Sequence, residues 1–175
     1  MNQLVSTEWL DKYLNRVKIL DASWHLPNVE RNALEEYKLS HITNSIFFDI
    51  DKNSNRNTNL PHMLPSTKEW ENIVSNLGIN NSDHVIVYDN SDVFSSCRVW
   101  YTFLYFGHNP ELISVLDGNF EKWKNEKHST SQEIKKINKS NYIASENLKL
   151  VLSKDQINKN IISKKFQLID ARGEQ

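Results

Sequence analysis

The sequence predicts an α/β domain built on a doubly wound parallel sheet with helices on both faces. Short apolar runs rich in β-branched residues alternate along the chain with segments whose apolar residues recur at helical spacing. Such alternation is typical of parallel strands that are joined by helices. The length of 175 residues also gives enough interior for one hydrophobic core without disulfides.

Helix and strand signals alternate through the first half of the chain. A serine before an acidic first turn is typical of a helix N-terminus, and a glycine after the last apolar turn favours its end. Runs that end in aspartate indicate strands, and the Asn-, Ser- and Asp-rich segment 51–60 predicts an exposed loop. The expected elements are a helix beginning at Ser6, a strand over 17–21, a helix over 34–39, a strand over 45–49 and a helix between Ser66 and Gly78.

The second half of the chain continues this alternation. Residues 84–88 form the clearest strand pattern, and Ser95 or Ser96 is expected to cap a helix that runs to Gly107. A further strand is expected over 112–116, before a short helix that follows an Asp-Gly turn. Together these elements predict one complete α/β domain over residues 1–125.

The remainder of the chain changes character. Lys, Asn, Ser and Gln dominate residues 126–147 and apolar residues are isolated there, which predicts a linker. Residues 148–175 then repeat the opening of the chain, because a serine-capped segment leads to a strand ending in Asp-Ala at 170–171, as at 21–22. We therefore expect the first helix and strand of a truncated second unit, with that strand left exposed.

Charge and cysteine content exclude several function classes. The 21 basic and 22 acidic residues give a net charge of −1, which removes the electrostatic basis for binding nucleic acid or a membrane. Cys97 is the single cysteine and the six histidines lack ligand spacing, so neither an internal disulfide nor a metal site is expected. The N-terminal residues lack a signal-peptide pattern. We expect a cytoplasmic protein, monomeric when intact, that needs no cofactor.

Ten short strings in the chain occur in an order that resembles a known family. They are LDASW at 20–24, EEY at 35–37, HI at 41–42, FFDID at 47–51, HMLPS at 62–66, LGI at 77–79, HVIVYD at 84–89, RVW at 98–100, FGH at 106–108 and VLDG at 115–118. In this order they resemble the two-domain rhodaneses of the thiosulfate or mercaptopyruvate sulfurtransferase group. The resemblance implies a rhodanese-like sheet and transfer of sulfane sulfur from thiosulfate or mercaptopyruvate to cyanide or a thiol.

The resemblance also implies that only the second domain carries the reactive cysteine, in a loop directly after a central strand. In this chain Asp89 stands at that position, and a carboxylate cannot hold sulfur as a persulfide. The first domain is therefore expected to be catalytically silent, with the reactive cysteine beyond Gln175. Arg98 is expected to pair with Asp89 or Asp92 and to hold this degenerate loop in place.

Candidate site residues follow from the same resemblance. Asp51 and His62 are expected at the domain interface, where a histidine oriented by a carboxylate assists proton transfer. Trp24 and Phe94 are expected beside the interdomain cleft, although Trp24 fits a plain core position equally. Arg172 is a weaker candidate for contact with an anionic substrate, and a role in the fold suits it as well.

Two other functions stay open at this point. The chain fits an independent, non-catalytic binding module that holds a partner or a small anion through the loop over 89–94. It also fits an enzyme that depends on the thiol of Cys97, which the first turn of a helix would activate. Against this second reading, Cys97 lies outside the expected loop position and on a helix face with Trp100, where a small buried residue suits packing.

Overall fold

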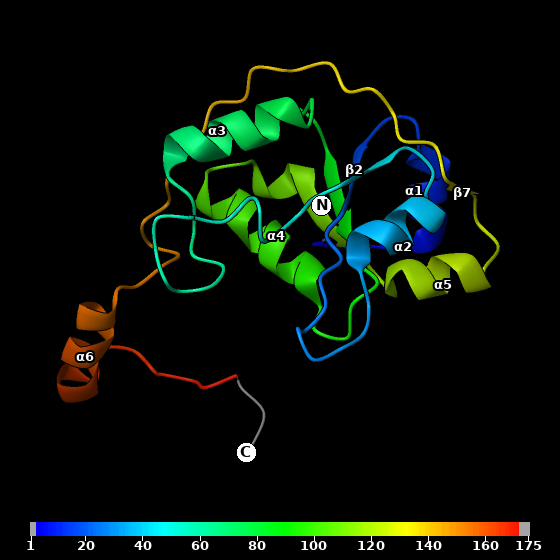
Figure 1. The fold of residues 1–175 in the computed structure, drawn as a ribbon. Helices are drawn as coiled ribbons and strands as arrows, with labels where there is room; N and C mark the ends of the chain where they lie inside the picture. Colours follow the sequence, from blue (N-terminus) through cyan, green and yellow to red (C-terminus); the bar gives the residue numbers. More distant parts are fainter. Residues whose placement is uncertain (1–2, 172–175) are drawn as a thin grey trace.

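The predicted doubly wound sheet is present in the computed structural model, which describes residues 3–171. Five parallel strands pair in the order β1-β6-β5-β2-β4 at the centre of the molecule (Figure 1). Their bounds are Leu4–Val5 for β1, Lys18–Asp21 for β2, Ser45–Phe47 for β4, Val85–Tyr88 for β5 and Ile113–Leu116 for β6. The two-residue β1 was not expected from the sequence, because so short a strand carries no periodic pattern.

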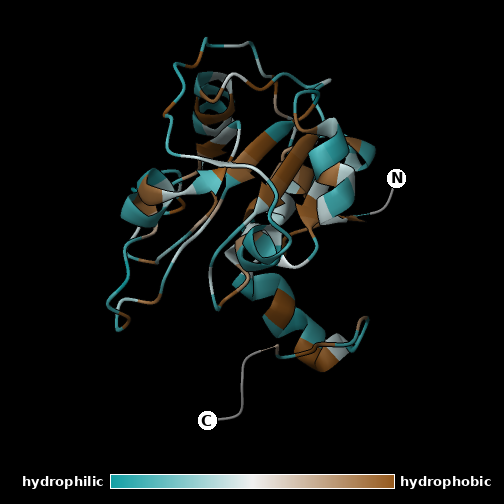
Figure 2. Cartoon of the chain, turned by 90° about the vertical axis from the view of Figure 1, so that its right-hand side faces the viewer, coloured by the Kyte–Doolittle hydropathy of each residue, from teal (hydrophilic) through white to brown (hydrophobic). Residues whose placement is uncertain are grey.

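Helices cover both faces of this sheet, as predicted. Successive residues of a strand point to opposite faces, so Leu20 packs with α3 and α4 while its neighbour Ile19 packs with α1 and α5. Figure 2 shows the apolar strands enclosed between helices whose outer surfaces are polar. The helices are α1 (Thr7–Tyr13), α2 (Ala33–Leu39), α3 (Thr67–Asn76), α4 (Ser95–Tyr105) and α5 (Asn119–Asn125), with a 3-10 turn at Pro110–Leu112.

The helix ends agree with the sequence signals except at α4. Ser66 and Glu69 form the expected capping box before α3, and Gly78 follows that helix with a φ of +66°. Neither Ser95 nor Ser96 caps α4, whose N-cap is Phe94 in the left-handed region without a side-chain hydrogen bond. The expected serine cap is wrong because a carboxylate from the end of β5, described below, accepts the free N–H of Ser96 instead.

Residues 126–147, the expected linker, form a strap packed on the domain. The strap begins as β7 (Thr130–Ser131), which pairs antiparallel with β3 (His41–Ile42), and then arches over the sheet to α3 (Figure 1). Tyr142 enters the core and is only 2% exposed, and its backbone N–H donates to Ser75 Oγ at 2.9 Å. A single buried anchor in a polar segment produces no periodic signal, so the sequence pattern resembles that of a linker.

Two glycines let the strap approach the helices closely. A Cβ atom at Gly78 would lie 2.8 Å from the Asn138 carbonyl oxygen, and one at Gly107 would lie 2.7 Å from the Ser145 carbonyl oxygen. The N–H of Ser145 donates to the Phe106 carbonyl at 3.0 Å. These glycines therefore end their helices, as expected, and also leave the space in which the strap lies.

As far as residue 171, the tail carries a helix and no strand. Ser153 caps α6 (Lys154–Ser163) through the expected capping pattern, and α6 projects away from the sheet (Figure 1). Residues 164–171 pair with no strand, and Leu168 and Ile169 are exposed. The expected strand is absent because a parallel strand needs a neighbouring strand for its backbone hydrogen bonds. That residues 148–175 open a second unit stays a prediction, and Arg172 lies outside the described residues.

Within residues 3–171, no helix combines the length and apolar composition needed to cross a membrane.

Candidate functional site

The candidate site lies at the carboxyl edge of the sheet, where β2 and β5 end side by side. From β2 the chain passes to β4 on one side and then returns to β5 on the other side of β2. The crevice at such a change of direction is the usual ligand position in open parallel sheets. The loops after β2, β4 and β5 therefore supply the side chains of the site.

Trp24, Asp51 and His62 form one hydrogen-bonded cluster at this edge. His62 Nε2 lies 2.7 Å from Asp51 Oδ1, and Trp24 Nε1 donates to Asp51 Oδ2 at 3.1 Å. The rings of Trp24 and His62 meet edge to face with their centroids 4.9 Å apart. The His62 side chain is 30% exposed, and one carboxylate oxygen of Asp51 holds it while the other holds Trp24. A histidine held by a carboxylate is suited to proton transfer.

Trp24 also lines a pocket of about 200 Å³ next to this cluster, together with Ser23, His25 and Asp51. The backbone N–H of Trp24 donates to Ser91 Oγ at 2.8 Å, which fixes the tryptophan to the loop after β5. Trp24 is partly buried, packs against the core and also faces the pocket, so its place beside an interdomain cleft stays a prediction.

Arg98 binds the backbone of His62 and so supports the cluster. Its guanidinium donates to the backbone carbonyl of His62, whose φ of +54° lies in the left-handed region. The expected ion pair with Asp89 or Asp92 is absent from the ion pairs of residues 3–171. Backbone N–H groups already occupy the Asp89 carboxylate in a buried position. The hydrogen bond from Arg98 stabilises a backbone conformation that is unfavourable for a histidine.

The loop after β5 is filled by its own carboxylate. Asp89 is 1% exposed, and its Oδ2 accepts the N–H of Ser96 at 2.7 Å while Oδ1 accepts the N–H of Ser91 at 3.2 Å. These N–H groups belong to the loop and to the N-terminus of α4, where an anion is otherwise stabilised. The Asp89 side chain thus occupies the anion position, which argues against a binding module that holds a small anion in this loop.

A second buried carboxylate supports the loop from β2. The hydroxyl and the N–H of Ser23 donate to Asp21 Oδ1 at 2.5 and 2.9 Å, and the Asn90 N–H donates to Ser23 Oγ at 2.8 Å. Burial raises the pKa of Asp21, and the hydrogen bonds from Ser23 oppose this shift. The pair joins the end of β2 to the loop after β5 and so fixes both walls of the crevice.

Glu36 is a site residue that the sequence analysis missed. Its carboxylate accepts both Nε and Nη2 of Arg31 at 2.7 Å and also the side-chain amide of Asn90 at 3.1 Å. The hydrogen bond from Arg31 lowers the pKa of Glu36. Glu36 and Arg31 lie on either side of the start of α2, so only the folded loop brings them to Asn90. The EEY string contains Glu36 but gives no sign of this role.

Cys97 and Phe94 are both exposed at the start of α4. Phe94 is 69% exposed at the tip of the loop, as a residue beside an interdomain cleft would be. The expectation that Cys97 is buried is wrong, because α4 begins after the left-handed Phe94 and turns Cys97 to the surface. Among residues 3–171 no side chain hydrogen-bonds the thiol, and no group of three His, Cys, Asp or Glu side chains is placed to hold a metal ion.

Comparisons with known proteins agree with this geometry. A model of the rhodanese-like domain family matches residues 6–126. The chain is 37% identical over 192 residues to thiosulfate/3-mercaptopyruvate sulfurtransferase 1, mitochondrial, of Arabidopsis thaliana, which covers 97% of this chain and 50% of that protein. It is 34% identical over 177 residues to 3-mercaptopyruvate sulfurtransferase of Mus musculus, covering 97% of this chain and 59% of that protein. The chain thus spans little more than half of these relatives.

A solved structure extends the likeness to the strap and the tail. The crystal structure of SseA from Escherichia coli, described with the fold and mechanism of 3-mercaptopyruvate sulfotransferases, matches with a TM-score of 0.91 at 29% identity. The match covers 99% of this chain and 66% of SseA. Tum1 from Saccharomyces cerevisiae matches with a TM-score of 0.84 at 30% identity, over 98% of this chain and 60% of that protein.

Proposed function

Since the chain belongs to the rhodanese-like domain family, we propose that it forms the non-catalytic part of a two-unit sulfurtransferase. The complete protein would move sulfane sulfur from 3-mercaptopyruvate or thiosulfate to a thiol or cyanide. In this proposal residues 1–125 are the silent unit, residues 126–147 strap it, and residues 148–175 open the second unit. The relatives named above carry both donors in their names, which supports the reaction class.

The observation that carries the proposal is the contact of His62 with Asp51 beside a loop that holds no thiol. The pair provides a positioned proton carrier at the crevice, whereas the loop that would carry a persulfide is filled by the Asp89 carboxylate. A unit of this kind can assist sulfur transfer but cannot accept the sulfur itself. The proposal therefore places the nucleophile on a second unit.

In the proposed reaction, a cysteine thiolate of the second unit attacks the sulfur atom of 3-mercaptopyruvate. The new S–S bond forms as the C–S bond of the donor breaks, and its electron pair passes to carbon as the enolate of pyruvate. The protonated imidazole of His62 supplies the proton that converts the enolate to pyruvate, and Asp51 stabilises the imidazolium. The persulfide sulfur then passes to a thiol or to cyanide, which restores the thiolate.

An assay of the purified 175-residue chain tests whether sulfur transfer requires the second unit. We expect it to transfer no sulfur from 3-mercaptopyruvate or thiosulfate to cyanide above the uncatalysed rate, because the exposed Cys97 has no hydrogen-bonded base within residues 3–171. Thiocyanate formation measures the transfer, and a Cys97→Ser variant is the matched control. Turnover by the chain that disappears in Cys97→Ser would make Cys97 the nucleophile and overturn the proposal.

A further inference from the structure

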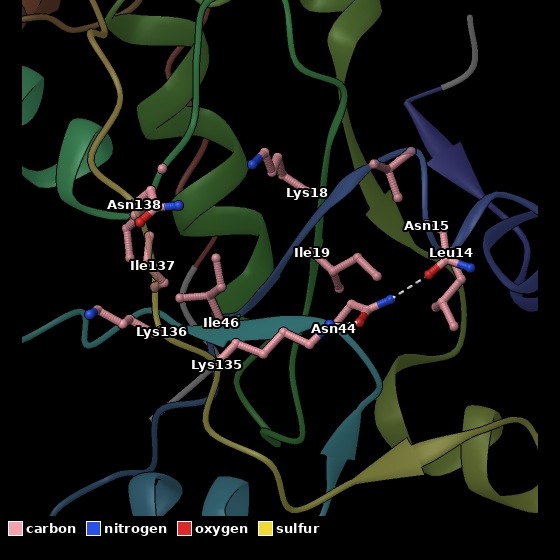
Figure 3. A pocket seen from close by; sticks show the side chains of 13 residues that line it. Leu14, Asn15, Lys18, Ile19, Asn44, Ile46, Lys135, Lys136, Ile137 and Asn138 are labelled. Carbon is pink, nitrogen blue, oxygen red and sulfur yellow. Dashed lines mark hydrogen bonds between the residues drawn. The ribbon is translucent and has the colours of Figure 1, made fainter.

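A second pocket lies at the opposite end of β2 from the candidate site. Its volume is about 380 Å³, and it opens between the start of β2, the end of α1, the end of α3 and the strap (Figure 3). Lys18 is the first residue of β2, whereas the candidate site lies beyond Asp21 at the other end. The pocket is therefore separate from the crevice that the proposed sulfur transfer uses, and its size suits a small molecule.

The polar lining of this pocket is cationic. Lys18, Lys135 and Lys136 line it, and the lining includes no aspartate or glutamate. Within residues 3–171, none of these lysines forms an ion pair. Figure 3 shows Lys18 extending toward Asn138 on the opposite wall, while Lys136 extends away from the centre. Like charges without counter-charges raise the local potential and favour an anion.

Part of this polar wall is fixed by hydrogen bonds. Asn44 Nδ2 donates to Asn15 Oδ1 at 2.8 Å, and the Lys135 ammonium donates to Asn44 Oδ1 (Figure 3). The chain Lys135–Asn44–Asn15 thus ties the strap to the loop after α1. A cation held by a neutral amide keeps its full charge available for a ligand.

The floor of the pocket is apolar. Ile19 is fully buried beneath it, and Ile46 and Ile137 present aliphatic surface from β4 and from the strap (Figure 3). Ile137 is brought to this wall by the strap, which passes so close to Gly78 that a Cβ atom there would lie 2.9 Å from Ile137 Cγ2. The strap therefore supplies both the apolar wall and two of the three lysines.

We propose that this pocket binds a small organic anion, with a phosphate, sulfonate or carboxylate group held by Lys18 and Lys135 and an apolar body against Ile46 and Ile137. The cationic rim selects the anionic group, and the aliphatic floor selects the body. A ligand with only the anionic group, or with only the apolar body, would contact only part of the lining. The site is independent of the sulfur-transfer crevice and of the cysteine that the proposed function requires.

Titration of the isotope-labelled 175-residue chain with phenyl phosphate, followed by amide NMR shifts, tests this site. We expect saturable shifts at residues 18, 46, 78 and 137. Inorganic phosphate and benzyl alcohol, which carry only the head or only the body, should shift these amides without saturating over the same range. Lys18→Gln and Lys135→Gln should each weaken phenyl phosphate binding about fivefold. Lys159→Gln on α6 makes the same charge change elsewhere and should leave binding unchanged.

Three results would overturn the proposal. Shifts spread over the surface without saturation would mean non-specific charge attraction. Binding of benzyl alcohol as tight as that of phenyl phosphate would mean a merely apolar groove. Equal weakening by Lys159→Gln and Lys18→Gln would mean that net charge, not this pocket, controls the binding. Retained dispersion of the amide spectrum in each variant shows that the fold is intact.

Discussion

Replacing His62 by asparagine in the proposed two-unit sulfurtransferase is expected to lower kcat/KM for 3-mercaptopyruvate by about a hundredfold. In the proposed reaction the imidazole, held 2.7 Å from Asp51, carries the proton, and asparagine cannot take its place. Asparagine also tolerates the left-handed backbone at this position, where φ is +54°, so the loop should keep its shape. Steady-state assays of pyruvate release measure the effect.

An assay with thiosulfate, the second sulfur donor, distinguishes a chemical role of His62 from a structural one. Thiosulfate releases sulfite, which leaves with its electron pair and needs no proton on carbon, so His62→Asn should lower its kcat/KM much less. His84→Asn, which removes an imidazole just before β5 at the other edge of the sheet, is the matched control and should leave both donors unaffected. Equal losses with both donors, or no loss with 3-mercaptopyruvate, would contradict the assigned role.

Replacing Tyr142 by alanine is expected to lower the free energy of unfolding of the 175-residue chain by about 3–5 kcal/mol. The ring is 2% exposed and packs edge to face on Phe103 and parallel to His108, and its hydroxyl lies 3.1 Å from His108 Nδ1. Its loss leaves a cavity under the strap and an unpaired buried imidazole nitrogen. Urea denaturation followed by tryptophan fluorescence gives the unfolding free energy.

A neighbouring strap residue gives the control for this loss. Ile143 is 64% exposed, so Ile143→Ala should change the unfolding free energy by less than about 0.5 kcal/mol. If Tyr142→Ala were as mild as Ile143→Ala, the segment 126–147 would behave as the linker that its composition suggests. The contrast between two adjacent residues therefore decides whether the strap belongs to the domain.

Elements with local signals could be predicted from the sequence. The capping box of Ser66 and Glu69 and the stop at Gly78 lie at the two ends of one ten-residue helix, and α3 forms where they place it. The strap and the start of α4 depend on contacts between distant residues. Neither the insertion of Tyr142 beneath α4 nor the capping of that helix by Asp89 produces a pattern in neighbouring residues.

The candidate site was predictable only in part for the same reason. Asp51 and His62 were selected by resemblance, because nothing in their spacing indicates that an irregular loop brings them within 2.7 Å. The contact of Arg98 with the His62 carbonyl was missed, since a backbone carbonyl is an acceptor that residue type does not identify. Side chains that bind backbone groups of distant loops are therefore the part of the site that is hardest to predict from the sequence.

Locating the transferred sulfur tests the central claim most directly. After the proposed two-unit protein is treated with 3-mercaptopyruvate, peptide mass spectrometry identifies any cysteine that carries an added sulfur atom. The proposed division of labour predicts a persulfide on a cysteine outside residues 1–175, with Cys97 unmodified. A persulfide on Cys97 that disappears in Cys97→Ser together with the activity would contradict it.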